Sequence, residues 1–150
     1  MDKREQILQR LVSVAESLPG VSAVLRNQPK LDDTRRPAIV ILDADEAVEL
    51  GPDGARREAG ATMLVAMTPQ VFIHATGDNA SDDSAGPTVN AWRAAWLKAV
   101  LLDPELLALV GSNGSIRYAG SATGFGWGRV MQGEIGIEIT FVYPLKPSDL

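Results

Sequence analysis

The sequence predicts an α+β fold, in which two main helices pack on one face of a largely antiparallel mixed sheet and a hairpin or loop projects from it. Three observations lead to this prediction. Apolar residues recur at helical spacing over residues 3–18 and 89–102, short β-branched runs lie between these helices, and apolar and polar residues alternate near the C-terminus. With 45% hydrophobic residues, the 150-residue chain suits one compact domain, 1–150.

The first predicted helix extends from Lys3 to Leu18. Its apolar residues are three and four positions apart and therefore share one face. Pro19 and Gly20 end it, because proline disfavours a helical conformation at the residue before it and glycine permits a chain reversal. The apolar face comprises Ile7, Leu8, Leu11, Val12, Ala15 and Leu18.

Two predicted strands follow, at 21–26 and 37–42. The second is apolar throughout, which indicates that both of its faces are covered. The next segment, 43–60, is acidic and contains a Gly-Pro-Asp-Gly turn sequence, so we expect a projecting hairpin or loop.

Apolar residues at 62–67 and 70–76 predict one long strand or two. Pro69 lies between these runs and cannot donate to a sheet ladder, so it indicates an edge or a bulge. The acidic segment 77–86 has no apolar residue larger than alanine, and we expect it to be disordered.

The second main helix is predicted over Val89 to Leu102, after Pro87. Trp92 and Trp96 lie on its apolar stripe, where core packing is favoured over an aromatic ligand box. Asp103 and Pro104 are typical of a helix start, so a short helix is expected to end at Gly111. Strands are predicted at 115–119 and 134–143.

Composition excludes several classes of protein. The net charge of −5 repels phosphate, so general nucleic-acid binding is not expected. The absence of cysteine and the single histidine exclude a disulfide scaffold, a thiol nucleophile and any metal site with two histidine ligands. There is no run of 18 apolar residues, and we expect a cytosolic protein without a membrane segment.

The glycine-rich segment 124–128 invites comparison with phosphate-binding loops. Such loops require a lysine and a hydroxyl residue after the last glycine, or the start of a helix, whereas here Arg129 and a strand follow. The segment is therefore either a flexible connection or a protein-contact loop. Phe125 and Trp127 favour the contact loop, because exposed aromatic side chains call for a partner, and Arg129 is included in it.

His74 is predicted to be structural, since it lies in an apolar strand with no recognisable nucleophile. Asp43, Asp45 and Glu46 follow a strand and could hold a divalent cation, but a solvated acidic loop is the favoured interpretation. We predict no catalytic residue, no metal and no cofactor.

Acidic residues gather in the two loop segments 43–60 and 77–87. These segments either keep the protein soluble, or meet a basic partner surface, or line a channel through which DNA passes. The acidic residues assigned to a protein interface are Asp43, Asp45, Glu46, Asp82 and Asp83.

The order of the elements resembles the tail terminator proteins of long-tailed bacteriophages, a family that includes minor tail or neck proteins of prophages and gene transfer agents. The resemblance covers nearly the whole chain. It is carried by the first helix with Leu18-Pro19-Gly20, by Arg26-Asn27, by the run 36–43, by Thr68-Pro69-Gln70, by the Trp-bearing helix, and by Ile116-Arg117-Tyr118 and the run 137–143.

The resemblance implies a non-enzymatic virion protein, present in the host cytoplasm during assembly. Members of this family close into a ring of six on the tail tube, stop its growth and present a surface to the neck. The implied partners are further copies of the chain, the tail tube protein and a head-completion protein, while DNA passes through the ring without specific binding.

Three alternative functions stay open. The chain could be a tail-completion or head-closure protein of the same neck region, or a small ligand-binding domain with an apolar pocket around Trp92 and Trp96. It could also be an enzyme using Asp43, Asp45 and His74 with a metal.

Overall fold

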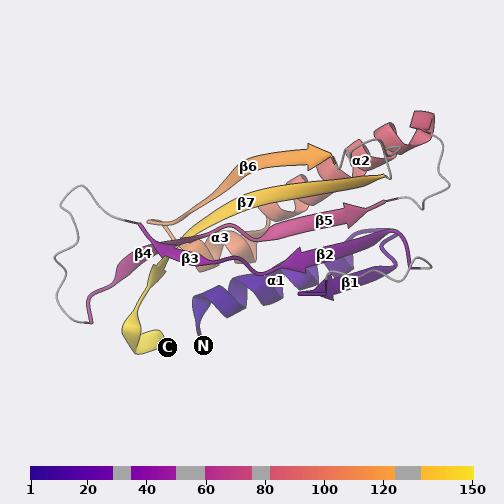
Figure 1. Ribbon diagram of the computed structural model, residues 1–150. Helices are drawn as coiled ribbons and strands as arrows, with labels where there is room; N and C mark the ends of the chain where they lie inside the picture. The colour runs from indigo at the N-terminus through magenta and orange to yellow at the C-terminus, as the bar shows by residue number, and fades with distance from the viewer. Residues whose placement is uncertain (29–34, 50–59, 76–81, 124–132) are drawn as a thin grey trace.

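A computed structural model describes residues 1–28, 35–49, 60–75, 82–123 and 133–150, with the side chains of 82–85 excepted (Figure 1). It confirms the α+β class. The described residues form helices α1 (Lys3–Ser17), α2 (Asp82–Leu101) and α3 (Pro104–Val110), the short 3₁₀ helix η1 (Pro147–Asp149), and strands β1 (Ala23–Arg26), β2 (Ala38–Leu42), β3 (Glu46–Val48), β4 (Met63–Met67), β5 (Gln70–His74), β6 (Ser115–Thr123) and β7 (Glu134–Leu145).

The long strand β7 organises the sheet. It pairs with β6 along one edge and with both β4 and β5 along the other, always antiparallel. Met67 lies opposite Phe141, and Gln70 lies opposite Glu138, so β4 and β5 keep a single register against β7. They are two halves of one strand interrupted at Pro69, as the sequence predicted.

β2 and β3 occupy the outer edge of this interrupted strand. β2 pairs antiparallel with β5, β3 pairs antiparallel with β4, and β1 lies parallel to β2 at the margin of the sheet. The prediction that all of 43–60 projects from the fold is therefore wrong for residues 46–48, because β3 completes a ladder that β4 leaves open. Residues 50–59 lie outside the described part of the chain.

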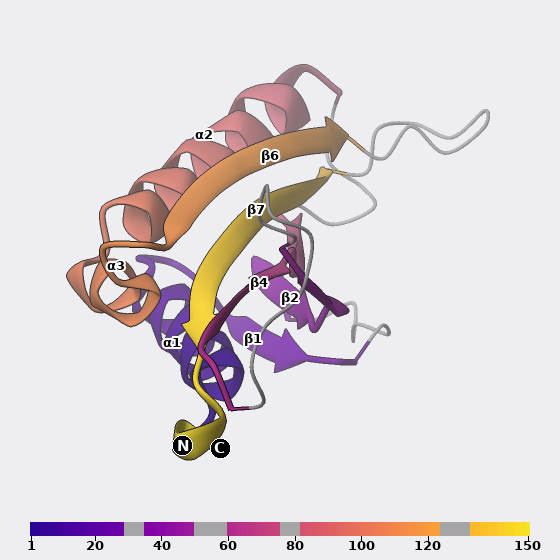
Figure 2. The same cartoon turned by 90° about the vertical axis from the view of Figure 1, so that its left-hand side faces the viewer.

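Three interruptions lie at one level of the sheet. β6 shifts its register against β7 between Tyr118 and Gly120, β4 and β5 separate at Pro69, and β2 and β3 separate at 43–45. Bulges and prolines bend strands and increase their twist. The sheet is accordingly creased at this level, and Figure 2 shows that β6 and β7 are curved.

The three helices lie on one side of the sheet, as expected (Figure 2). α1 begins at the cap residue Asp2, whose carboxylate accepts a hydrogen bond from the N–H of Arg4, and it ends where Leu18 turns to an extended conformation before Pro19. Trp96 is fully buried, which confirms that it packs in the core rather than in a ligand box. Val14, rather than the predicted Val12, completes the buried face of α1.

α2 begins earlier than the sequence predicted. Residues 82–86 were expected to be disordered, but they form the first turns of the helix, and Pro87 lies within it. Acidic residues at a helix N-terminus interact favourably with the helix dipole, a contribution that an argument from burial alone omits. The expectation for 77–81 lies outside the described residues.

An ion pair connects α1 to α3. Nε and Nη2 of Arg10 donate to the two carboxylate oxygens of Asp103, at 3.0 and 2.7 Å. Asp103 also caps α3 by accepting from the N–H of Leu106 at 2.9 Å. The Asp103 side chain is only 7% exposed, and Arg10 together with the cap lowers its pKa.

Gly114 is predicted to tolerate no side chain. A Cβ at this position would collide with the carbonyl oxygens of Val110 and Val142, neither of which can move without disturbing α3 or β7. We expect Gly114→Ala to lower the free energy of unfolding by about 3 kcal/mol, measured by urea titration.

Gly86 provides the matched control. It lies in α2 with open space around it, so Gly86→Ala should leave stability unchanged or raise it by up to about 1 kcal/mol. Equal effects of the two substitutions would contradict the close approach at Gly114.

Candidate interaction surface

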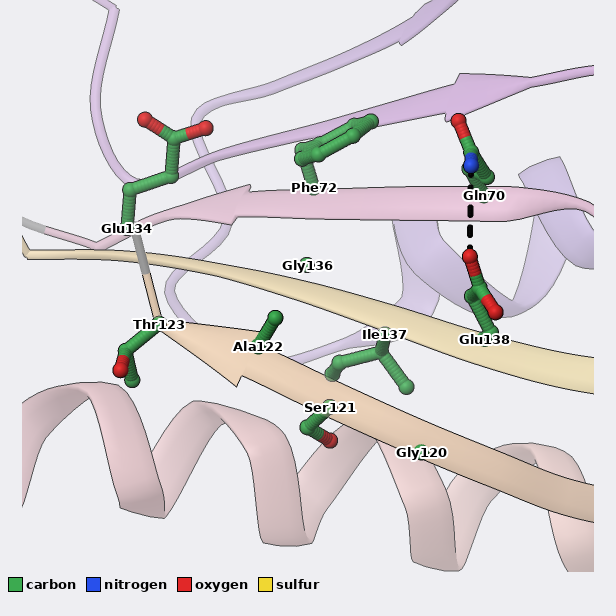
Figure 3. Close-up of a pocket in the computed structure, with 10 residues that line it drawn as sticks. All are labelled: Gln70, Phe72, Gly120, Ser121, Ala122, Thr123, Glu134, Gly136, Ile137 and Glu138. Carbon is green, nitrogen blue, oxygen red and sulfur yellow. Dashed lines mark hydrogen bonds between the residues drawn. The ribbon is translucent and has the colours of Figure 1, made fainter. Parts of the chain in front are cut away.

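The sheet face opposite the helices carries a groove of about 420 Å³. We call this face the open face, because no helix or strand of the described chain lies on it (Figure 2). Phe72, Gly136 and Ala122 are cross-strand neighbours on β5, β7 and β6, so the side chains of Phe72 and Ala122 point to the same face on either side of Gly136 (Figure 3). Gly136 and Gly120 contribute no side chains, which leaves space between the side chains that border the groove.

The Phe72 ring lies against Gly136. A Cβ built on Gly136 would come within 3.2 Å of this ring. An aromatic side chain that covers a glycine on the neighbouring strand shields its backbone from water. The pair therefore gives the open face an apolar floor in the middle of the sheet.

Polar residues border the groove. Gln70 donates to Glu138 at 3.2 Å across β5 and β7 (Figure 3). Glu134 lies at the other end of the groove, where it faces His74 at 3.7 Å between Nδ1 and Oε2. Two carboxylates thus flank an apolar floor, and the surface has an acidic rim.

His74 is 18% exposed beside Glu134. Burial lowers the pKa of its imidazole, Glu134 opposes this shift, and Arg36 adds to it. The neutral form is therefore favoured in the folded protein. Ala38 lies opposite His74 and Leu42 lies opposite Gln70, so Asp43 and His74 lie near opposite ends of the β2–β5 pairing. This separation removes the geometric basis of the alternative in which Asp43, Asp45 and His74 share a metal.

Asp43 belongs to an ion cluster rather than to an exposed acidic loop. Nε and Nη2 of Arg26 donate to its two carboxylate oxygens at 2.9 and 2.8 Å, and the same guanidinium donates to both oxygens of Glu5. The Asp43 N–H also donates to the side chain of Asn27. Arg26 lowers the pKa of both acids. Because Glu5 lies in α1, Arg26 ends β1 and Asp43 follows β2, the cluster joins the helix to the ends of these two strands.

The other predicted interface residues are dispersed. Asp45 is exposed, and Glu46 on β3 accepts a hydrogen bond from the hydroxyl of the buried Tyr143. Burial, together with Glu46, raises the pKa of that hydroxyl. Asp82 and Asp83 form the start of α2. Phe125, Trp127 and Arg129 lie outside the described residues.

The outer edge of β6 carries a polar cluster with an aromatic ring. The Arg93 guanidinium lies 5.3 Å from the centre of the Tyr118 ring and donates to its hydroxyl at 3.0 Å, and that hydroxyl contacts Ser121. Tyr118 remains 40% exposed. The cluster attaches α2 to the edge strand.

Sequence reasoning missed the groove residues. A glycine within a predicted strand, such as Gly136, often marks the close approach of another group, and this was the available signal. Within the described ranges, no group of three or more potential ligands could hold a metal ion, and no helix is long and apolar enough to cross a membrane.

Similarity to known proteins is found among solved structures. No family model matches the chain, and no curated protein matches it. Among solved structures, the chain is similar to the sheath/tube terminator of an extracellular contractile injection system, PVC, in the extended state. The TM-score is 0.48 and the identity 11%, over 96% of this chain and 55% of the terminator chain, so the present chain matches about half the length of that protein.

The neutral state of His74 predicts a pH dependence of stability. Because the folded pKa lies below the ordinary value of 6.5, the unfolded chain takes up a proton first as the pH falls. The stability that the neutral His74 imidazole contributes is complete above pH 6.5. It declines as the pH falls from there toward the lower pKa of the folded state. We expect the free energy of unfolding to fall between pH 7.5 and 5.5, and this slope to be reduced in His74→Gln.

The measurement is urea unfolding at several pH values within this window. The pKa values of Glu5, Asp43 and Asp103 are lowered from ordinary values of 4.5, 3.8 and 3.8. The stability that these carboxylates contribute is therefore lost only in more acidic solutions, and it does not affect the slope between pH 7.5 and 5.5. Parallel curves for wild type and His74→Gln would contradict the burial of a neutral imidazole.

Proposed function

We propose that this chain is a structural protein of a tail-like particle and acts as a tail terminator. It closes into a ring, with six copies expected from the sequence resemblance, at the head-proximal end of the tail tube. There it ends tube growth and presents a joining surface to a head-completion protein. The proposed role requires no catalysis, metal or cofactor.

The observation that carries this proposal is the one-sided cover of the sheet. Helices protect only one face, and the open face presents an apolar groove with Glu134 and Glu138 at its rim. A ring formed by rotation needs two different contact patches on each subunit. A second macromolecule on the open face is consistent with this requirement.

Charge supports the passage of DNA through such a ring. The net charge of −5 disfavours tight contact with phosphates. DNA that must travel through a ring requires a lining that does not hold it. The acidic composition is therefore compatible with a channel.

Native mass spectrometry across protein concentration, followed by negative-stain imaging, tests the proposal. We expect rings of about six copies with an open centre, formed either by the protein alone or after addition of tail tubes from the same particle. A protein that stays monomeric and does not cap tubes would contradict it. Binding to filled heads without binding to tubes would instead support the tail-completion or head-closure alternative.

The predicted contact loop has a separate test. We expect replacement of both Phe125 and Trp127 by alanine to change the free energy of unfolding by less than about 1 kcal/mol while impairing ring formation or tube capping. Thermal unfolding and the assembly assay measure the two effects. A large loss of stability with normal assembly of the folded fraction would place both residues in the core.

A further inference from the structure

We propose that the groove on the open face receives the exposed side of α2 from a second copy of the chain. This contact deepens the proposed function and rests on it, since a ring subunit must offer two different patches. Three observations on this chain favour a second copy as the occupant: the composition of α2, the charges of the two patches, and their matching lengths.

The exposed side of α2 is unusually apolar. Ala91, Ala95 and Lys98 on α2, and Leu102 directly after its end, are spaced by four, three and four residues and form one stripe directed away from the buried Trp96; the N–H of Leu102 still donates to the carbonyl of Lys98. Leu102 is 67% exposed, and Lys98 is the only charged residue of the four. We call these four residues the α2 stripe. An exposed helix face in a soluble protein usually carries several charges, so this stripe suits contact with another apolar surface.

The two patches have complementary charge. The groove has Glu138 at one end and Glu134 at the other, and the α2 stripe has a single lysine. His74, which faces Glu134, is held neutral and does not cancel its charge at neutral pH. The ammonium group of Lys98 would therefore meet carboxylate oxygens at the rim of the groove, which favours this contact and disfavours an acidic partner.

The dimensions also agree. The α2 stripe covers eleven residue steps, or roughly 16 Å of helix axis. The groove runs from Glu134 to Glu138, four steps or roughly 14 Å of strand. Gly120 and Ala122 line the β6 side of the groove with little or no side chain, whereas the Phe72 ring covers Gly136, so a helix that carries alanines can approach most closely along β6.

The positions of the patches decide the kind of assembly. α2 packs on β5, β6 and β7 from one side, and the groove opens on the other side of the same three strands. One copy therefore cannot satisfy its own groove, and two copies joined in this way each keep one patch free. Such a contact is heterologous and continues from copy to copy until a ring closes.

A charge-reversal series tests the contact. Lys98→Glu should weaken association between copies by at least about tenfold, because it places a carboxylate against the acidic rim. Lys98→Glu combined with Glu138→Lys should recover most of this loss. Lys146→Glu is the matched control, because Lys146 is exposed and lies outside both patches. Association is measured by sedimentation velocity or by native mass spectrometry, with circular dichroism to verify folding.

Cross-linking gives an independent readout, because the natural chain contains no cysteine. An Ala95→Cys chain mixed with an Ala122→Cys chain should yield a covalent dimer with a short bismaleimide reagent, whereas Ala95→Cys mixed with Ser148→Cys should not. All three positions are exposed, so the substitutions spare the core.

The outcomes separate this contact from the proposed function. Rings or capped tubes that form normally with Lys98→Glu, and without the 95–122 cross-link, would overturn the contact and leave the terminator role standing. A 95–122 cross-link and rescue by the double reversal, in a protein that caps no tubes, would support the contact and reject the role. Absence of both association and cross-link at high protein concentration would overturn the contact.

Discussion

Both edges of β7 are paired, and the register of these pairings determines where the other elements lie. Ile135, Ile137, Ile139, Phe141 and Tyr143 point to the helices and are buried. The alternate residues Gly136, Glu138 and Thr140 point to the open face. A slip of one residue would exchange these two sets and place a carboxylate in the core. The hydrophobic alternation of this strand therefore fixes the core and the exposed surface together.

Interactions across the strands reinforce that register. Phe72 covers Gly136, Gln70 donates to Glu138, and the hydroxyls of Thr68 and Thr140 form a hydrogen bond of 2.8 Å beside the crease. Around the sheet, ion clusters centred on Arg26 and Asp103 hold α1 against its neighbours. Polar groups at the ends of elements thus orient a helix layer whose stability comes mainly from burial of apolar side chains.

The functional argument follows from this division of the sheet into two faces. Among the described elements the helices cover one face, so the surfaces that these elements leave for further assembly are the open face, the sheet edges and the outer surface of the helices. The open face offers an apolar groove with an acidic rim, and the outer surface of α2 offers alanines, one leucine and one lysine. These surfaces lie on opposite sides of the same strands, an arrangement that suits a repeating contact between copies better than a closed pair.

Local rules were enough to place α1, the interruption at Pro69 and the burial of Trp96. Each depends on residues a few positions apart: the spacing of apolar side chains, the missing N–H of proline, and the position of a tryptophan on a helical stripe. The start of α2 could not be placed in this way, because the acidic residues that favour a helix N-terminus also suggest a solvated loop.

The sequence thus determined the class of fold, the main helices and most strands, because apolar periodicity is a local property. The folded arrangement alone decided that β3 joins the sheet, that Arg26 binds Glu5 and Asp43, and that Phe72 meets Gly136 to form the groove. In each of these cases the partners are far apart in the chain. Their meeting depends on strand order and register, which are set by the packing of the whole sheet.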